Sequence, residues 1–323
     1  MSVLMLESVD PDAMAAIGQE HRLILAPTPD ALAHGLDLDA VEGIVTRGRG
    51  RVDRALLDAC PALRAVARCG VGVDNIDLAA AAARGVPVLY APGSNAAAVA
   101  EQAVMLMLMT LRRGFAMAAA AKADDWGARS GFDGDDLGGS HVCIVGPGAV
   151  GRRTGELVAA FGARVTACSR DGRGIAGLRA ALDDALPQAD IVSLHLPLTD
   201  ETRTLFDRQT IGRMKPGAIL INTARGELLD RAALLDALES GALSAYGADV
   251  AHDEPPEPGD PVIGHPNAVV TPHVASLTRR TYREMSLTTA RNLLAVLRGG
   301  MPEVRAVHPG GAPVPGPPAG RQA

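Results

Sequence analysis

The sequence predicts an α/β fold with two doubly wound parallel sheets. Short apolar runs alternate with helix-like segments along most of the 323 residues, and a glycine-rich turn at residues 146–151 separates an apolar run from a helix-like run. Strands that alternate with helices favour a parallel sheet with both faces covered. The chain is also long enough for two α/β domains of ordinary size, so we expect two sheets rather than one.

The N-terminal part of the chain carries the elements of the first sheet. Its strand-like runs are residues 3–6, 23–26, 43–46, 63–68 and 86–90, with helical patterns at 52–59 and 78–84. A long helix rich in Ala, Met and Leu is predicted from residue 96 to residue 121, with Ser94 or Asn95 as its N-cap. The length of this helix predicts that it bridges two lobes.

A second alternating series follows the Gly/Asp-rich break at residues 130–140. Its strand-like runs are residues 142–145, 164–168, 191–195, 218–222, 245–250 and 268–271. We expect a helix at 230–240, which Gly241 is placed to end, and an amphipathic helix at 277–298. Residues 304–307 are expected to form a last strand or an edge contact to the first lobe, and the Pro/Gly-rich residues 310–323 to be disordered.

Composition excludes several classes of function. The net charge is −6 with both signs scattered, so no basic stripe indicates nucleic-acid binding, and aromatic residues make up 2% of the chain, too few for a base-stacking platform. No apolar stretch has the length of a membrane span, and the N-terminus lacks the basic start of a signal peptide. We expect a cytoplasmic protein without a metal site, with reduced, buried thiols at Cys60, Cys69, Cys143 and Cys168.

The turn Gly146-Pro147-Gly148-Ala149-Val150-Gly151 fits the G-x-G-x-x-G pattern of a dinucleotide site. The first glycine makes the tight turn, the second lets the backbone approach a pyrophosphate, and the third lets helix pack on strand. Glycine-rich turns are common in a chain with 36 glycines. The strand before this turn, the helix after it and the second strand that ends about 20 residues later favour a nucleotide site, with the phosphates at the positive end of the helix.

The second strand of this unit ends at Cys168-Ser169-Arg170, followed by Asp171. A site that prefers NAD needs a carboxylate here for the ribose 2′-hydroxyl. Ser169 and Arg170 remove the repulsion of a 2′-phosphate and supply a cation that binds it. The sequence therefore predicts NADP(H) as cofactor. NAD(H) stays open, because Asp171 would take the acidic role if Arg170 were a solvated surface charge.

Three polar residues follow successive apolar runs: Arg225, Glu254 and His273. The carboxyl ends of strands in an open parallel sheet line one crevice, so we expect these side chains to meet. Arg225 would grip a carboxylate, while His273, stiffened by Pro272, would exchange a proton near neutral pH. Glu254 would hold the imidazole tautomer and raise its pKa. A carboxylate-binding cation beside a proton donor and its carboxylate partner suits hydride transfer to or from a carbonyl next to a carboxylate. The plainer interpretation is a surface arginine, a structural histidine and a loop acid.

Several further short motifs occur along the chain. They are Gly70-Val71-Gly72-Val73-Asp74-Asn75-Ile76-Asp77, Val99-Ala100-Glu101, the glycine turn, His195-Leu196-Pro197-Leu198-Thr199, Met214-Lys215-Pro216-Gly217, Asn222-Thr223-Ala224-Arg225-Gly226, Asp249-Val250 with Glu254-Pro255, and Thr271-Pro272-His273. In this combination residues 40–308 resemble the D-isomer-specific 2-hydroxyacid dehydrogenases. The chain looks like the phosphoglycerate dehydrogenase and glyoxylate/hydroxypyruvate reductase members of this family.

The resemblance implies a domain plan and a role for each site residue. Residues 1–95 with 281–309 would form a flavodoxin-like substrate lobe, and 96–280 a Rossmann cofactor lobe that makes the contact of a homodimer, with a cleft between the lobes. Arg225 would bind substrate, Glu254 would partner the histidine, His273 would be the acid/base, and Asp249 would hold the nicotinamide carboxamide. The implied cofactor contacts are Gly146, Gly148, Ala149, Val150, Gly151, Ser169, Arg170, Leu196, Pro197, Thr223, Ala224, Arg225, Asp249, His273 and Ser276. The implied substrate contacts are Arg47, Val71, Gly72 and Arg225.

The resemblance implies an NAD(P)-dependent enzyme that interconverts a 2-keto acid and a D-2-hydroxy acid, most closely a glyoxylate/hydroxypyruvate reductase. D-3-phosphoglycerate dehydrogenase is the alternative, because Arg47, Arg49 and Arg51 would favour a second anionic group unless they form a solvated basic loop. The alternative of another class is a dinucleotide-sensing corepressor, which uses the same scaffold but would not need an aimed acid. A formate dehydrogenase is less favoured, because formate oxidation needs no proton donor. No regulatory domain follows the last helix, so serine feedback is not expected.

Overall fold

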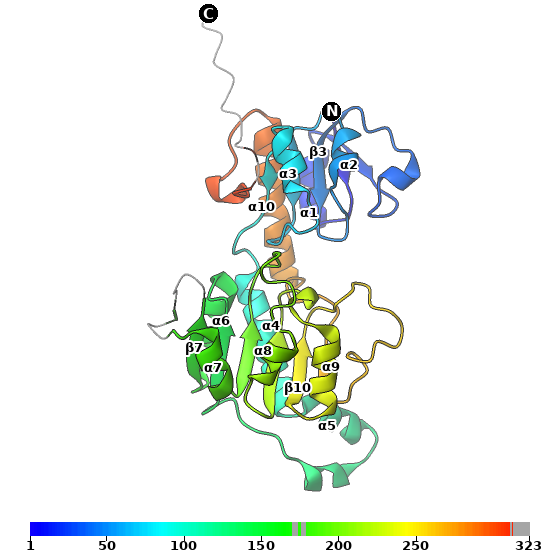
Figure 1. Cartoon of the computed structure of the whole chain (residues 1–323). Coiled ribbons are helices and arrows are strands. Elements are labelled where there is room, and N and C mark those ends of the chain that lie inside the picture. The colour runs from blue at the N-terminus through cyan, green and yellow to red at the C-terminus, as the bar shows by residue number, and fades with distance from the viewer. Residues whose placement is uncertain (170–173, 176–178, 311, 313–323) are drawn as a thin grey trace, which may run out of the picture. The chain divides into compact units, whose positions relative to one another are not determined.

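The structure, a computed structural model, describes residues 1–169, 174–175, 179–310 and 312 (Figure 1). The chain divides into two compact units. Unit 1 consists of Met1–Asn95 and Leu277–Ala323, and unit 2 of Ala96–Ser276. Each unit is built on its own parallel sheet, which confirms the predicted α/β fold with two doubly wound sheets.

Unit 1 has the strand order β2-β1-β3-β4-β5, which is the flavodoxin-like order. The strands are β1 (Ser2–Met5), β2 (Arg22–Leu25), β3 (Val41–Thr46), β4 (Ala65–Arg68) and β5 (Val88–Leu89). The helices are α1 (Pro11–Gly18), α2 (Arg54–Asp58), α3 (Leu78–Ala83) and α10 (Arg279–Leu297), with short 3₁₀ turns η1 (Leu32–His34) and η5 (Val304–Ala306). Alternate residues of β1 enter two cores, Leu4 with α2 and α3, and Val3 with α1 and α10.

Unit 2 has the strand order β11-β10-β9-β8-β6-β7. The strands are β6 (His141–Val145), β7 (Arg164–Cys168), β8 (Ile191–Leu194), β9 (Ala218–Asn222), β10 (Leu243–Ala248) and β11 (Ala268–Val270). Among the described residues a parallel bridge joins Arg179 to Ala167 of β7, at the place of the third strand in the usual dinucleotide-binding order. The order reverses between β6 and β8, and ligands of open α/β sheets bind outside such a switch point.

Helices cover both faces of the unit 2 sheet. They are α4 (Ala96–Leu111), α5 (Gly114–Lys122), α6 (Ala149–Ala160), α7 (Leu182–Ala185), α8 (Arg208–Gly212) and α9 (Arg231–Glu239), with 3₁₀ turns η2 (Trp126–Gly131), η3 (Leu186–Gln188) and η4 (Gly226–Leu228). One apolar core includes α4 and α6, and the other includes α7, α8 and α9. The buried strands read as nearly continuous apolar runs because both faces are covered.

The predicted single helix from 96 to 121 is wrong. The chain forms α4 and α5, which meet at an angle of 63°. Arg113 between them has a φ of 45°, a left-handed conformation that ends an α-helix. Helix α4 packs against α6, β9 and β10 inside unit 2 and is a core element of that unit rather than a bridge.

The predicted last strand at residues 304–307 is a 3₁₀ turn, η5, followed by one antiparallel bridge from Val307 to Leu89. The alternative, an edge contact within the first lobe, is what the structure contains. Most of the Pro/Gly-rich end, residues 311 and 313–323, lies outside the described residues, as does Arg170. Among the described helices none is by itself long and apolar enough to cross a membrane, and the bent pair α4 and α5 passes that test by length and composition alone.

Candidate active site

The glycine turn between β6 and α6 has the geometry that a dinucleotide needs. Gly146 has a φ of 92°, and a Cβ there would lie 2.6 Å from the backbone oxygen of His195. A Cβ on Gly151 would lie 2.3 Å from the oxygen of Gly146, so the start of α6 sits directly on the turn. Around Gly148, just before Ala149 begins α6, no described atom lies within 4 Å of an added Cβ. The turn therefore leaves open the side on which a pyrophosphate would meet the positive end of α6.

The end of β8 forms the other side of this turn. Leu196 approaches it closely, because its Cδ2 would lie 2.9 Å from a Cβ on Gly146. Burial lowers the pKa of His195 to about 3, and its Nε2 atom lies 3.0 Å from the hydroxyl of Ser193. His195 is therefore a neutral imidazole near neutral pH, and its backbone rather than its charge shapes the turn.

The end of β9 carries Arg225, and Asn222 organises the turn that leads to it. The side-chain oxygen of Asn222 accepts from the N–H of Ala224 at 3.0 Å, and its amide donates to the oxygen of Arg225 at 2.8 Å. The Thr223 hydroxyl is buried and has no hydrogen-bond partner among the described residues. An orphaned buried hydroxyl costs free energy, so it fits a place where a bound ligand completes the contacts.

Gly226, the residue after Arg225, brings two loops together. A Cβ at this position would lie 2.0 Å from the oxygen of Ala251 and 2.6 Å from the Cα of His252. A side chain there would push apart the turn that carries Arg225 and the loop that leads to Glu254. The absence of a side chain at 226 thus explains how the first two members of the predicted trio come near each other.

Glu254 and His273 form a hydrogen-bonded pair. The Nδ1 atom of His273 lies 2.7 Å from Oε2 of Glu254, and the N–H of Ala251 donates to the other carboxylate oxygen at 3.2 Å. Burial raises the pKa of Glu254, but the hydrogen bond and charge of His273, the N–H of Ala251 and the charge of Arg225 outweigh it. The pKa of Glu254 therefore lies below its ordinary value. The side chains of His273 and Glu254 are 43% and 40% exposed, so a small molecule can reach them.

The backbone conformation of His273 and the contacts of its loop set the orientation of the imidazole. His273 has a φ of 54°, which is uncommon for a residue with a side chain and occurs often at functional sites. The loop around it is fixed by Asp249, a buried carboxylate after β10. Asp249 accepts from the N–H of Val274 at 3.0 Å, from the N–H of Ala275 at 2.8 Å and from the hydroxyl of Thr271 at 2.5 Å. Both carboxylate oxygens thus hold the loop that carries His273.

The structure brings together three of the site residues predicted in unit 2. Arg225, Glu254 and His273 follow β9, β10 and β11 at one edge of the sheet, and the charge of Arg225 acts on Glu254. Ser169 follows the last residue of β7, while Arg170 lies outside the described residues. The predicted substrate contacts Arg47, Val71 and Gly72 belong to unit 1, in the loops after β3 and β4.

Two residues that shape this site, Asn222 and Gln102, have no predicted role, and Asp249 is predicted only as a cofactor contact. Asn222 orders the turn of Arg225, and Asp249 also anchors the loop of His273. Gln102 of α4 donates to the Thr271 hydroxyl at 2.9 Å and so supports the same loop from behind. Asn222 and Asp249 stand in motifs that were recognised, whereas Gln102 lies in an apolar helix 169 residues away in sequence and no local pattern marks it.

The sequence of this chain matches the sequences of known proteins. Residues 104–275 match the model of the NAD-binding domain of the D-isomer-specific 2-hydroxyacid dehydrogenases. A glyoxylate reductase from Aeropyrum pernix is 36% identical over 293 residues, which cover 85% of this chain and 85% of that protein. A D-3-phosphoglycerate dehydrogenase from Mycobacterium bovis is 36% identical over 305 residues, which cover 92% of this chain and 57% of that protein. The chain thus spans little more than half the length of this dehydrogenase.

A solved structure is similar over nearly the whole chain. It is the NADPH-dependent glyoxylate/hydroxypyruvate reductase from Sinorhizobium meliloti in complex with NADP and malonate, which is 28% identical. The TM-score is 0.87, and the match covers 96% of this chain and 97% of that one. Unit 2 is therefore a nicotinamide dinucleotide-binding domain, and the chain belongs to the family of D-isomer-specific 2-hydroxyacid dehydrogenases.

Proposed function

We propose that the protein is an NAD(P)-dependent dehydrogenase that interconverts 2-keto acids and D-2-hydroxy acids, and that it works mainly as a reductase of glyoxylate or hydroxypyruvate. The contact of 2.7 Å between His273 and Glu254, beside Arg225 and at the same sheet edge as the glycine turn, carries the proposal. These groups are a proton donor, its stabilising carboxylate and a carboxylate-binding cation. The family and the names of the relatives support the same activity.

The roles of the three residues follow from their chemistry. A bound NAD(P)H supplies the hydride. Arg225 binds the substrate carboxylate through paired hydrogen bonds and polarises the neighbouring carbonyl. Because Nδ1 of His273 is engaged by Glu254, Nε2 is the nitrogen that gives its proton to the carbonyl oxygen during reduction and takes it back during oxidation. Glu254, ionised because its pKa is lowered, stabilises the imidazolium before the transfer.

We assign the cofactor to the carboxyl edge of the unit 2 sheet. The open side of Gly148 and the buried, unpartnered hydroxyl of Thr223 among the described residues fit a dinucleotide. Asp249 would take the nicotinamide carboxamide, and Ser169 would leave room for a 2′-phosphate. The remaining proposed contacts are Gly146, Ala149, Val150, Gly151, Leu196, Pro197, Ala224, Arg225, His273 and Ser276. We propose NADPH as the preferred cofactor, as in the similar reductase from Sinorhizobium meliloti.

The substrate contacts of unit 1 complete the proposal. We propose that the N–H groups of Val71 and Gly72 and the side chain of Arg47 also bind substrate. Oxidation of D-3-phosphoglycerate is the second candidate, because the loop after β3 holds Arg47 and Arg49 and a phosphoglycerate dehydrogenase is among the relatives. A phosphate on the substrate would suit that positive loop.

We further propose a cytoplasmic homodimer. Unit 2 presents an apolar groove lined by Val104, Met105, Leu108, Met109 and Phe161. Trp126, which follows helices α4 and α5 in sequence, is 71% exposed. Apolar surfaces of this kind mark protein interfaces. The four cysteines are buried and free, as expected in a reducing compartment. Sedimentation of the purified protein tests the dimer.

Steady-state assays test the function. Glyoxylate, hydroxypyruvate and 3-phosphohydroxypyruvate are offered with NADPH and with NADH, and the loss of absorbance of the reduced cofactor is followed. We expect turnover of all three acids with NADPH, with the highest kcat/KM for the first two. Tight binding of NADPH without turnover of any of the three acids would contradict the proposal and favour a dinucleotide sensor.

A further inference from the structure

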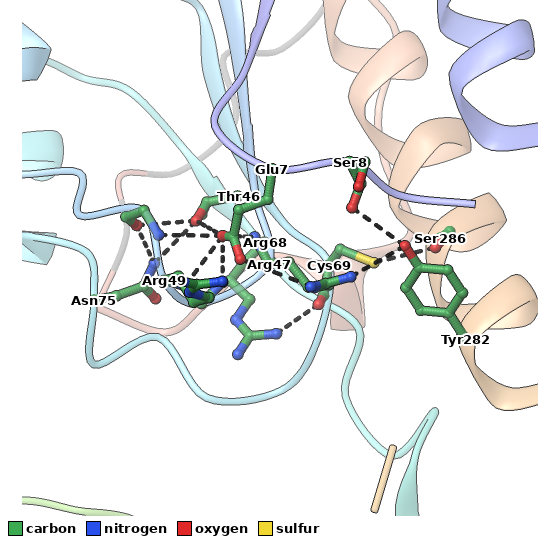
Figure 2. Close-up of polar contacts among 12 residues, drawn as sticks. Glu7, Ser8, Thr46, Arg47, Arg49, Arg68, Cys69, Asn75, Tyr282 and Ser286 are labelled. Atoms are coloured by element: carbon green, nitrogen blue, oxygen red, sulfur yellow. Dashed lines mark hydrogen bonds and ion pairs between the residues drawn. The ribbon is translucent and has the colours of Figure 1, made fainter. Parts of the chain in front are cut away.

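A carboxylate from β1 organises the loop between β3 and α2 in unit 1. Figure 2 shows Glu7, the second residue after β1, inside the loop that follows Thr46. One atom, Oε2 of Glu7, accepts from four consecutive backbone N–H groups: Arg47 at 2.8 Å, Gly48 at 2.9 Å, Arg49 at 3.1 Å and Gly50 at 3.1 Å. The Thr46 hydroxyl lies 3.2 Å from the same oxygen.

Successive N–H groups that converge on one point form an anion-binding nest, as in phosphate-binding loops. Here the nest is filled by a side chain of the same protein. The side chain of Glu7 is 7% exposed, and burial raises its pKa, but the four backbone hydrogen bonds outweigh burial and lower the pKa overall. The carboxylate is therefore ionised near neutral pH, and the loop is ordered before any ligand arrives.

The same carboxylate helps to orient Arg47. The second oxygen of Glu7, Oε1, lies 3.9 Å from Nε of Arg47. At the other end of the guanidinium, Nη1 donates to the hydroxyl of Tyr282 at 3.3 Å, and the guanidinium carbon lies 5.7 Å from the centre of the Tyr282 ring. The Tyr282 hydroxyl in turn donates to the backbone oxygen of Ser8, the residue after Glu7 (Figure 2). The cation is thus held on both sides, and neither contact uses its Nη2 atom.

The nest also joins the loop that follows β4. Asn75 donates to the oxygen of Gly50 at 2.6 Å and to the Thr46 hydroxyl at 3.1 Å. The Arg68 side chain runs past Gly70, because a Cβ there would lie 1.5 Å from its Nη1 atom. The loops after β3 and β4, on which we placed the substrate contacts of unit 1, are therefore fixed to each other around the Glu7 carboxylate.

We propose that Glu7 is a positioning residue that presets the arginine loop, residues 46–51, and that with Tyr282 it holds Arg47 in an orientation that recognises a second anionic group on 2-keto acids. The substrate part of this inference rests on the proposed function, while the ordering of the loop does not. Glu7 itself does not touch the substrate. It acts through the direction of the Arg47 guanidinium.

The test compares Glu7→Gln with Glu20→Gln, a carboxylate of unit 1 that is paired with Arg298 away from the loop. A glutamine has nearly the same shape but supplies no charge to the four N–H groups. We expect Glu7→Gln to raise KM for 3-phosphohydroxypyruvate and oxaloacetate by about tenfold, the scale of one charge-assisted contact. KM for glyoxylate and all kcat values should stay within about twofold, because the reacting groups are elsewhere. Glu20→Gln should change none of these values.

Tyr282→Phe supplies a second, milder variant, since the ring stays and the hydrogen bond to Arg47 is lost. It should raise KM for the same two doubly anionic acids by a smaller factor than Glu7→Gln does. Equal rises in KM for glyoxylate and for the doubly anionic acids in the Glu7→Gln enzyme would overturn the proposal, because they indicate general damage rather than lost positioning.

Hydrogen exchange separates the inference from the proposed function. In the Glu7→Gln protein the amides of residues 47–50 should exchange at least about tenfold faster, since their shared acceptor is weakened. In Glu20→Gln they should keep the wild-type rate. This measurement needs no turnover, so it tests the loop even if the wild-type protein reduces no keto acid. Unchanged exchange at residues 47–50 in Glu7→Gln would overturn the positioning role whatever the assays show.

Discussion

The Nδ1 atom of His273 lies 2.7 Å from Oε2 of Glu254, and this contact joins two loops that are 19 residues apart in sequence. The pair sits after β10 and β11, with Arg225 after β9, so three adjacent strands each supply one group. Asp249 fixes the histidine loop and Gly226 lets the arginine turn approach the glutamate loop. The site is therefore built on the sheet edge, where strand order sets which groups become neighbours.

Replacing the proposed proton donor should abolish turnover but not cofactor binding. In His273→Ala we expect kcat for glyoxylate reduction to fall by about 10² to 10⁴, the usual contribution of general acid catalysis. The affinity for NADPH, measured by fluorescence titration, should stay within about threefold, a difference of less than 1.4 kcal/mol. His252→Ala is the matched control, because His252 is a neighbouring exposed imidazole bonded to Asp253. Undiminished turnover in His273→Ala would remove the residue from the mechanism.

Removal of the Glu254 carboxylate should change the pH dependence of kcat/KM. Glu254 has a lowered pKa and is ionised near neutral pH, so it favours the protonated imidazole beside it. Glu254→Gln removes that charge, and the pH at which kcat/KM for reduction declines should move downward. Profiles of both enzymes are measured with glyoxylate between pH 5 and pH 9, a range in which the assay itself is stable. Superimposable profiles would contradict the pairing.

Two of the three glycines of the turn, Gly148 and Gly151, should respond differently to alanine. Gly148→Ala meets open space and should keep the wild-type melting temperature while weakening NADPH binding by about tenfold, since the methyl occupies the phosphate approach. Gly151→Ala places a methyl against the oxygen of Gly146 and should lower stability by about 1–3 kcal/mol. Calorimetry and cofactor titration on both variants separate the two effects. Loss of stability in Gly148→Ala would show that this face is packed rather than open.

Ser169 should govern the choice between the two dinucleotides. Ser169→Asp places a carboxylate where the ribose 2′-group is proposed to bind, so it should repel a 2′-phosphate and accept from a 2′-hydroxyl. We expect the ratio of kcat/KM for NADPH to that for NADH to fall by about tenfold to a hundredfold. Ser240→Asp, at the end of α9, is the control for an added surface charge. A wild-type enzyme that already prefers NADH would count against our assignment of NADPH.

Glu7 should contribute stability that disappears in acid. Its pKa in the folded protein lies below the ordinary value of 4.5, so its contribution is fully present above that value and is lost as the pH falls through the folded pKa. At pH 7, Glu7→Gln should lower the free energy of unfolding by about 1–3 kcal/mol. Urea unfolding at pH 7, 5, 4 and 3 should show the difference between the two proteins shrinking toward zero. A difference independent of pH would show that the carboxylate charge is not what stabilises the loop.

The sequence predicts the sheet edge well because the reason is local. Apolar runs of strand length end at Arg225 and His273, and parallel strands bring such ends together. The same reasoning fails for helix α4. Its composition is apolar on both sides of Arg113, and the bend depends on one left-handed backbone angle that composition does not report.

Glu7 shows a second limit of sequence reasoning. Its partners are backbone N–H groups about 40 residues further along the chain, and backbone groups carry no sequence signal. In the sequence, residue 7 is an ordinary acidic residue after the first strand. Only the folded structure shows that its carboxylate accepts hydrogen bonds from the loop. Gln102 is a similar case, since its partner Thr271 is reached through tertiary packing.

The close approach at Gly226 has a consequence for redesigning this protein. Since nothing larger than hydrogen fits against Ala251, the arginine turn and the glutamate loop must shift together or stay as they are. Laboratory selection for new substrates should therefore leave position 226 untouched and accumulate its changes in the arginine loop, whose support comes from a separate carboxylate. Substitutions in the arginine loop should then change the choice of substrate without altering the reacting groups.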